Sequence, residues 1–139
     1  MQAHRTVEDE MLRRPTVLSA EATVDDVRAF FDRDHVHLCL LVDGDRLVGT
    51  VTRGDLAGAS TSVARATDIA VMDGRVVLPT EGAEATRNRM VTAGRRRLAV
   101  TDVNGRLVGL LCLKRSRLGF CSADDVAARA EDSPRRHGR

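Results

Sequence analysis

The chain has 139 residues, of which 42% are hydrophobic and 30% charged, an ordinary globular balance that suits one compact domain or two joined halves. Its net charge of +2 is too small to indicate a nucleic-acid-binding protein by itself. With three Phe and neither Trp nor Tyr, the core must be aliphatic, and the chain lacks the stacking rings of a platform for single-stranded nucleic acid.

The first predicted elements are a helix at residues 7–14 and a short extended segment at residues 15–19. Another predicted helix begins after Thr23, which can form a capping box with Asp26 three residues later. The apolar spacing of this helix predicts one buried stripe, made of Val24, Val27, Phe30 and Phe31.

A predicted hairpin follows, with strands at residues 37–43 and 46–52 around an Asp-Gly turn, and a short helix starts near Arg53. The same order returns 60 residues later, where "RLVG" at residues 106–109 repeats residues 46–49 without a gap. The second set comprises a lead-in at 66–74, an extended segment at 75–79, a helix at 83–93, strands at 97–102 and 106–112, and a helix capped by Ser122.

One half is too small to bury its own sheet face, so the two halves should pack together. We therefore predict an α/β fold of two pseudo-symmetric repeats, each strand–helix–strand–strand–helix, with a small sheet flanked by helices. The predicted boundaries are residues 1–62 for the first repeat with its N-terminal helix and 63–128 for the second. Residues 129–139 form a basic tail that we expect to be disordered.

Thr52 and Asp55 are the polar residues of the repeated stretch that suggest a binding site. Thr52 can cap the helix that starts at Arg53, and the free N–H groups of a helix start can bind phosphate. Asp55 lies on the same side one turn later, and its carboxylate suits two vicinal hydroxyls of a ribose. The simpler interpretation is that both residues only stabilise the helix start.

Over residues 5–128 the sequence resembles a tandem pair of cystathionine-β-synthase-type (CBS) domains, the Bateman module. The resemblance is carried by the duplication, by "HVHLCLLVDGDRLVGTVTRGDL" and by "RRRLAVTDVNGRLVGLLCLKR". The ligand motif of the family, glycine–hydrophobic–Thr/Ser–x–x–Asp, is matched at residues 49–55. The family binds adenosine-containing ligands such as AMP, ADP, ATP and S-adenosylmethionine between its two repeats.

The resemblance implies that ribose binds to Asp55 and phosphate to Thr52 and the helix start at Arg53. It implies an adenine site along the early and middle strands, at Thr16, Val17, Leu18, His37, Leu38 and Cys39. It further implies a regulatory module rather than an enzyme, with no required cofactor and with an adenine nucleotide as ligand. A homodimer is expected. Exposure of Leu12, Val27, Phe31 or Met90 on the surface of one chain would be consistent with it.

The second copy of the motif departs from this pattern, because Cys112 replaces the hydroxyl and Arg115 replaces the carboxylate. The second cleft is therefore expected to lack its sugar contacts. Its residues could instead reach the phosphates of a ligand in the first cleft or be solvated basic residues. These residues are Arg97, Leu98, Ala99, Cys112, Lys114 and Arg115.

The remaining signals are weak. His35 and His37 form an H-x-H pair without further metal ligands, so we predict no metal site. The odd number of Cys (Cys39, Cys112 and Cys121) fits buried thiols in a reducing cytosol better than a disulfide framework. No run of residues is apolar enough for a membrane span or a secretory signal, which predicts a cytoplasmic protein without membrane contact.

Three functions remain open from the sequence. The first is a stand-alone nucleotide sensor that acts on an unidentified partner protein, and the second is a ligand-free dimeric scaffold. The third and weakest is nucleic-acid binding through the basic residues of the tail and Arg95, Arg96 and Arg97. If Asp55 binds ribose, we expect Asp55→Ala to weaken affinity by about 1.5–3 kcal/mol while changing the stability of the free protein little.

Overall fold

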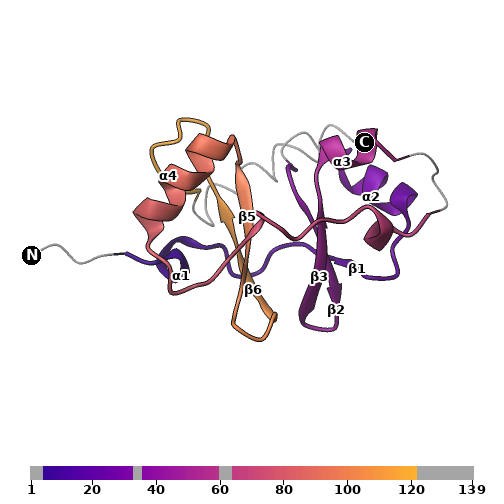
Figure 1. Cartoon of the computed structure of the whole chain (residues 1–139), viewed down its shortest axis with the longest axis horizontal. Coiled ribbons are helices and arrows are strands. Elements are labelled where there is room, and N and C mark those ends of the chain that lie inside the picture. Colours follow the sequence, from indigo (N-terminus) through magenta and orange to yellow (C-terminus); the bar gives the residue numbers. More distant parts are fainter. Residues whose placement is uncertain (1–4, 33–35, 60–63, 122–139) are drawn as a thin grey trace, which may run out of the picture.

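A computed structural model describes residues 5–32, 36–59 and 64–121. It contains two three-stranded sheets that stand side by side, each with helices packed against it (Figure 1). The predicted α/β fold of two similar repeats is confirmed. The first sheet has the order β1–β2–β3 and the second the order β4–β5–β6. The strands are β1 (Leu18–Ser19), β2 (Cys39–Asp43), β3 (Arg46–Val51), β4 (Val76–Val77), β5 (Arg97–Thr101) and β6 (Leu107–Cys112).

Each sheet combines one parallel and one antiparallel pair. β1 runs parallel to β2, and β2 and β3 form the predicted hairpin around Gly44, whose φ is 66°. The second repeat has the same pairing, with a hairpin turn at Gly105, φ 87°. A left-handed backbone of this kind favours glycine, which explains the Asp-Gly and Asn-Gly pairs at the two turns.

All four α-helices of the described residues begin where the sequence predicted. α2 (Val24–Phe30) has the capping box between Thr23 and Asp26, with the Asp26 N–H donating to Thr23 Oγ1 at 3.1 Å. α3 (Arg53–Ala57) starts after Thr52, and α4 (Ala83–Ala93) ends at Gly94 in the left-handed conformation. The second-repeat helix predicted after Ser122 and the tail at 129–139 lie outside the described residues.

The first helix is shorter than predicted. α1 (Val7–Glu10) ends because Met11 is already extended, with φ −76° and ψ 154°. The chain then pairs through Leu12, whose N–H and carbonyl both bond to Leu110 of β6. These backbone bonds satisfy polar groups that a longer helix would have used internally, so tertiary pairing overrides the helical propensity of residues 11–14.

The lead-in segments cross between the repeats. Val7 and Met11 are buried in the second-repeat core beside Met90 and Leu111, so α1 packs on α4 and β6, as Figure 1 shows. Conversely, Ala66 of the 3-10 turn η1 (Ala66–Asp68) is buried in the first-repeat core. Each repeat is therefore completed by a segment that the sequence order assigned to the other.

The repeated glycine of "LVG" serves this crossing. A Cβ at Gly49 would lie 2.5 Å from the Cβ of Ala70, and one at Gly109 would lie 2.5 Å from Met11 Sδ and 2.9 Å from the Leu12 carbonyl oxygen. Both positions need glycine because a lead-in segment passes directly over the strand. The repetition of this residue is thus explained by packing.

The residues suggested for a dimer surface are mostly interior. Val27 is fully buried, Met90 is 1% exposed and Phe31 is 4% exposed, all within the core of one chain, and Leu12 is half-buried. This part of the expectation is wrong, because the apolar side chains of these helices pack inside the core of their own repeat. A third cluster joins the sheets, with Leu38, Leu40, Leu47 and Ala99 at its centre.

Candidate functional site

Thr52 and Asp55 form a capping box at the start of α3. The Asp55 N–H donates to Thr52 Oγ1 at 3.2 Å, and the Thr52 N–H donates to Asp55 Oδ2 at 2.9 Å. This is the contact that the T-x-x-D spacing predicted, and α2 has the same box at Thr23 and Asp26. α3 has only five residues, and its cap already uses one of the N–H groups expected to hold phosphate.

Asp55 also has a partner that the sequence analysis missed. Arg75 Nη1 lies 2.6 Å from Asp55 Oδ2 and Arg75 Nη2 lies 3.3 Å from Asp55 Oδ1, a two-pronged ion pair. Both side chains are largely buried, with 10% of Arg75 and 18% of Asp55 exposed. Arg75 Nη1 also lies 3.5 Å from the Thr50 carbonyl oxygen, while its buried Nε has no hydrogen-bond partner.

The ionisation of Asp55 is set by this environment. Burial raises the pKa of its carboxyl, but the hydrogen bonds from Arg75 and Thr52 and the Arg75 charge together outweigh burial. The net result is a pKa below the usual range, so the carboxylate is charged at neutral pH.

The crossing of the lead-in segments explains why Arg75 reaches Asp55. Thr50 of β3 exchanges backbone hydrogen bonds with Val71, at 3.1 and 2.8 Å. This pairing places the segment that leads into β4 beside the end of β3. Arg75 immediately precedes β4 and is held there by its carbonyl, which accepts from the Ala99 N–H at 2.9 Å. The first motif therefore meets the beginning of the second repeat.

The early strand of the first repeat, β1, lies on the far side of β2 from Asp55. Leu18 pairs with Leu41 of β2, whereas β3 is on the opposite edge of β2. Thr16, Val17 and Leu18 thus approach the sheet end where β2 begins and β3 ends, but β2 separates them from Thr52 and Asp55. Their predicted contact with adenine stays a prediction.

The middle-strand residues differ in access. Leu38 and Cys39 are 6% and 0% exposed and pack in the core, so only their backbone could border a ligand. Burial raises the pKa of Cys39 to about 12, which makes it an unreactive thiol, as a small buried hydrophobe should be. His37 is half-buried, and His35 lies outside the described residues.

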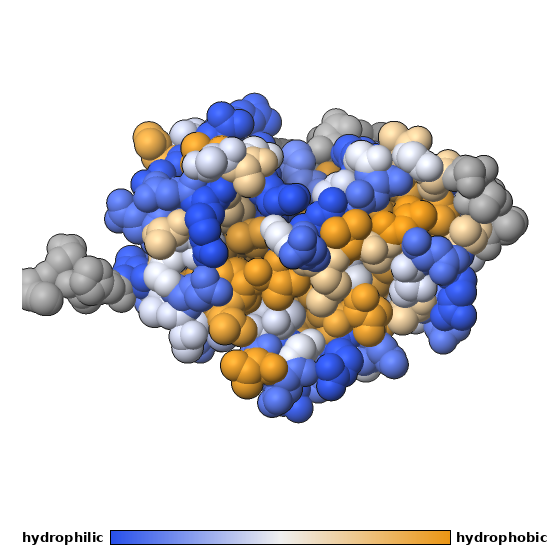
Figure 2. Space-filling model, viewed as in Figure 1, coloured by the Kyte–Doolittle hydropathy of each residue, from blue (hydrophilic) through white to orange (hydrophobic). Residues whose placement is uncertain are grey.

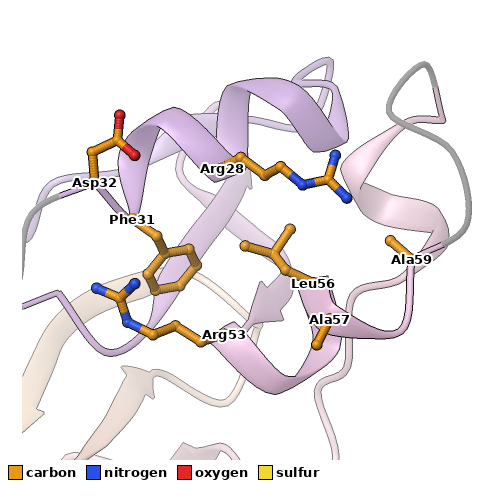
Figure 3. Close-up of a pocket in the computed structure, with 7 residues that line it drawn as sticks. All are labelled: Arg28, Phe31, Asp32, Arg53, Leu56, Ala57 and Ala59. Carbon is orange, nitrogen blue, oxygen red and sulfur yellow. The ribbon is translucent and has the colours of Figure 1, made fainter.

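Arg53 borders an open cavity of about 430 Å³ between α2 and α3 (Figure 3). Its guanidinium lies 5.0 Å from the centre of the Phe31 ring, and Nη2 donates to the Val36 carbonyl at 3.2 Å. Among the predicted ligand residues, Arg53 is the one that lines this cavity. The full lining consists of Arg28, Phe31, Asp32, Arg53, Leu56, Ala57 and Ala59.

The second copy of the motif does not begin a helix within the described residues. After β6 the chain makes a turn, in which the Lys114 N–H donates to the Gly119 carbonyl at 2.9 Å and Arg117 has φ 67°. Lys114 and Arg115 are exposed on this turn. Leu98 and Ala99 are buried core residues, and Arg97 is buried with Nη1 donating to the Arg96 carbonyl.

The expectation of three free thiols is wrong in this structure, because Cys112 and Cys121 form a disulfide. Cys112 ends β6, and the turn brings Cys121 back so that its N–H donates to the Cys112 carbonyl at 2.6 Å. Cys112 therefore offers no thiol to a ligand in the second cleft. The sequence spacing of nine residues gave no signal for this pairing.

Other site classes find little support among the described residues. No group of three or more His, Cys, Asp or Glu is placed to hold a metal ion within residues 5–32, 36–59 and 64–121. Within the same ranges, no helix is long and apolar enough to cross a membrane. In the basic cluster, Arg97 is buried and Arg96 Nε donates to the Leu113 carbonyl, so both are engaged within the fold.

Comparison with known proteins agrees with this architecture. Residues 7–62 match the family model of the CBS domain. The chain resembles the cystathionine beta-synthase pair domain of a proposed Mg²⁺ transporter from Shewanella oneidensis MR-1 (TM-score 0.70, 21% identity, 94% of this chain and 72% of that one). None of the curated proteins matches the sequence.

Two of the similar structures contain nucleotides. One is a CBS domain protein from Pyrobaculum aerophilum complexed with AMP (TM-score 0.66, 24% identity, 91% of this chain and 98% of that one). The other is the cytosolic domain of the Mg²⁺ channel MgtE in complex with ATP (TM-score 0.65, 23% identity, 89% of this chain and 48% of that one). At these identities the likeness shows a shared fold.

Proposed function

The chain is a tandem pair of CBS domains, a Bateman module, and from this premise we propose that it is a regulatory module that binds an adenosine-containing nucleotide. Pairs with this fold have been solved with AMP and with ATP, which supports AMP, ADP or ATP as the ligand. S-adenosylmethionine is the further candidate of the same class. The module would act without catalysis and without a cofactor, by changing its contacts with a partner.

The Asp55 carboxylate carries this proposal. It lies at the start of α3 with both oxygens arranged for two-pronged donors, as the guanidinium of Arg75 demonstrates. Two vicinal ribose hydroxyls present a similar pair of donors. Arg75 and Arg53 supply positive charge near the same helix start, which supports a ligand that carries phosphate.

A ligand-free scaffold is the second candidate function. The observation that favours it is that Asp55 already has hydrogen-bond partners, in Arg75 and the Thr52 N–H. In this alternative the carboxylate only fixes the lead-in of the second repeat against the first. Asp55→Ala would then lower stability and leave the response to nucleotides unchanged.

In either function we propose a homodimer, and as a nucleotide sensor it would pass its signal to a partner protein. Figure 2 supports this, because apolar side chains gather in the middle of the face in view, over the region between the two sheets. An apolar patch on the surface is typical of a protein interface. Sedimentation equilibrium would contradict the dimer by giving the mass of one chain at all concentrations.

The proposed ligand class is tested by thermal unfolding with AMP, ADP, ATP and S-adenosylmethionine, one at a time. A ligand at a hundred times its dissociation constant stabilises the folded protein by about 2.7 kcal/mol. With an unfolding entropy of about 2.1 cal/mol/K per residue, the midpoint should rise by about 9 °C. The rise should be lost in Asp55→Ala, because the ribose hydroxyls lose their acceptor.

Asp26→Ala is the matched control, since Asp26 forms the same capping box at α2 and pairs with no arginine there in the described contacts. It should keep the full ligand response. The structure changes one expectation for Asp55→Ala, which leaves Arg75 buried without its anion and should itself cost about 3–5 kcal/mol. Each shift is therefore measured against the same variant without ligand. No shift with any ligand would favour the scaffold.

A further inference from the structure

The Arg75–Asp55 pair occupies the carboxylate that the proposed function gives to ribose. Both Asp55 oxygens face the guanidinium, at 2.6 and 3.3 Å, and the Arg75 side chain is 10% exposed. Asp55 Oδ2 also accepts from the Thr52 N–H, so a ribose that donates to both oxygens competes with Arg75 for the carboxylate. Ligand binding would be an exchange of partners rather than the filling of an empty site.

The exchange leaves a buried guanidinium that needs a new anion. A buried charge that loses its partner is strongly destabilising, and no neutral hydroxyl of the ribose replaces the carboxylate. Arg75 Nη1 keeps only the long contact with the Thr50 carbonyl, and its buried Nε lacks a hydrogen-bond partner even before the exchange. An incoming phosphate would supply the missing charge and an acceptor for Nε–H.

We propose that Arg75 closes the first cleft against ligands without a phosphate and selects nucleotides that carry one. This inference rests on the proposed function, and it narrows the ligand class to phosphorylated adenine nucleotides. Adenosine would displace Arg75 from Asp55 and leave the buried guanidinium without an anion. AMP displaces Arg75 from Asp55 and gives the guanidinium its phosphate instead.

The test is calorimetric titration of the full chain with adenosine and with AMP. The quantity compared is the ratio of their dissociation constants in the wild type and in Arg75→Gln. Gln is neutral, so adenosine no longer leaves a buried charge behind and should bind more tightly. AMP gains from the same release but loses its guanidinium contact, so the preference for AMP should fall by about tenfold or more.

Two further variants make the result specific. Arg13→Gln removes an exposed arginine that pairs with Glu8 and should leave the ratio unchanged. Arg75→Lys keeps the buried charge and loses the two-pronged geometry, so it should retain the preference for AMP. If Arg75→Gln does not fold, as circular dichroism would show, Arg75→Lys decides the matter: a preference for AMP that weakens by tenfold there would overturn the charge argument.

The failures are distinguishable. An unchanged ratio in Arg75→Gln, with binding that still depends on Asp55, would overturn the role of Arg75 and leave the nucleotide sensor intact. No binding of AMP or adenosine to the wild type or to Arg75→Gln would overturn the proposed function and the role of Arg75 together.

Discussion

At the scale of residues, Asp55 couples its own ionisation to folding. The hydrogen bonds from Arg75 and Thr52 hold its pKa below the usual value despite burial. Such a carboxylate stabilises the fold fully above its unfolded pKa of about 4, and this contribution is lost as the pH falls through the lower folded value. The difference in unfolding free energy between wild type and Asp55→Asn should be constant from about pH 5 to 7 and shrink below about pH 4. Urea titrations across this range measure it, and a difference that persists unchanged to about pH 3 would contradict the ion pair.

Asp55 makes two contacts within the fold, the cap with Thr52 and the ion pair with Arg75, and the sequence predicted only the cap. Thr52 and Asp55 are three residues apart, and a helix start brings that spacing together whatever surrounds it. Arg75 lies twenty residues further along, and long-range backbone pairing, of Thr50 with Val71 and of Arg75 with Ala99, brings it to the carboxylate. A basic residue directly before "VVLP" carries no local signal of such a contact.

At the scale of elements, the disulfide fixes the turn that replaces the second motif. Cys39 is buried with a pKa of about 12, so native protein purified without reductant should react with no thiol reagent. Denaturation should expose one thiol, from Cys39, and reduction should raise the number to three. Cys121→Ser should show two thiols when denatured without reductant. Three thiols in the unreduced, denatured wild type would mean that the pair does not form in solution.

Elements were predictable where local signals agree. α4 coincides with its predicted range of residues 83–93, since Gly94 ends it, and both hairpins follow from their turn glycines. The helix at 7–14 was too long because the pairing of Leu12 with Leu110 is a long-range contact. Where an element ends because of a long-range contact, the local sequence pattern does not predict its end.

At the scale of the whole molecule, the duplication predicted two similar repeats but not their crossing. α1 completes the second core and η1 the first, so neither predicted boundary encloses a complete core. The hairpin tips also meet, with the Leu47 N–H donating to Gly105 and the Leu107 N–H to Asp45. The candidate site depends on this crossing, because Asp55 belongs to the first repeat and Arg75 leads into the second.

The central claim is that a nucleotide binds at Asp55, and a crystal structure of the protein soaked with AMP tests it most directly. The account predicts ribose hydroxyls within hydrogen-bond distance of the Asp55 carboxylate and Arg75 turned from Asp55 to the phosphate. AMP bound instead in the cavity beside Arg28 and Arg53, with the Arg75–Asp55 pair intact, would contradict it.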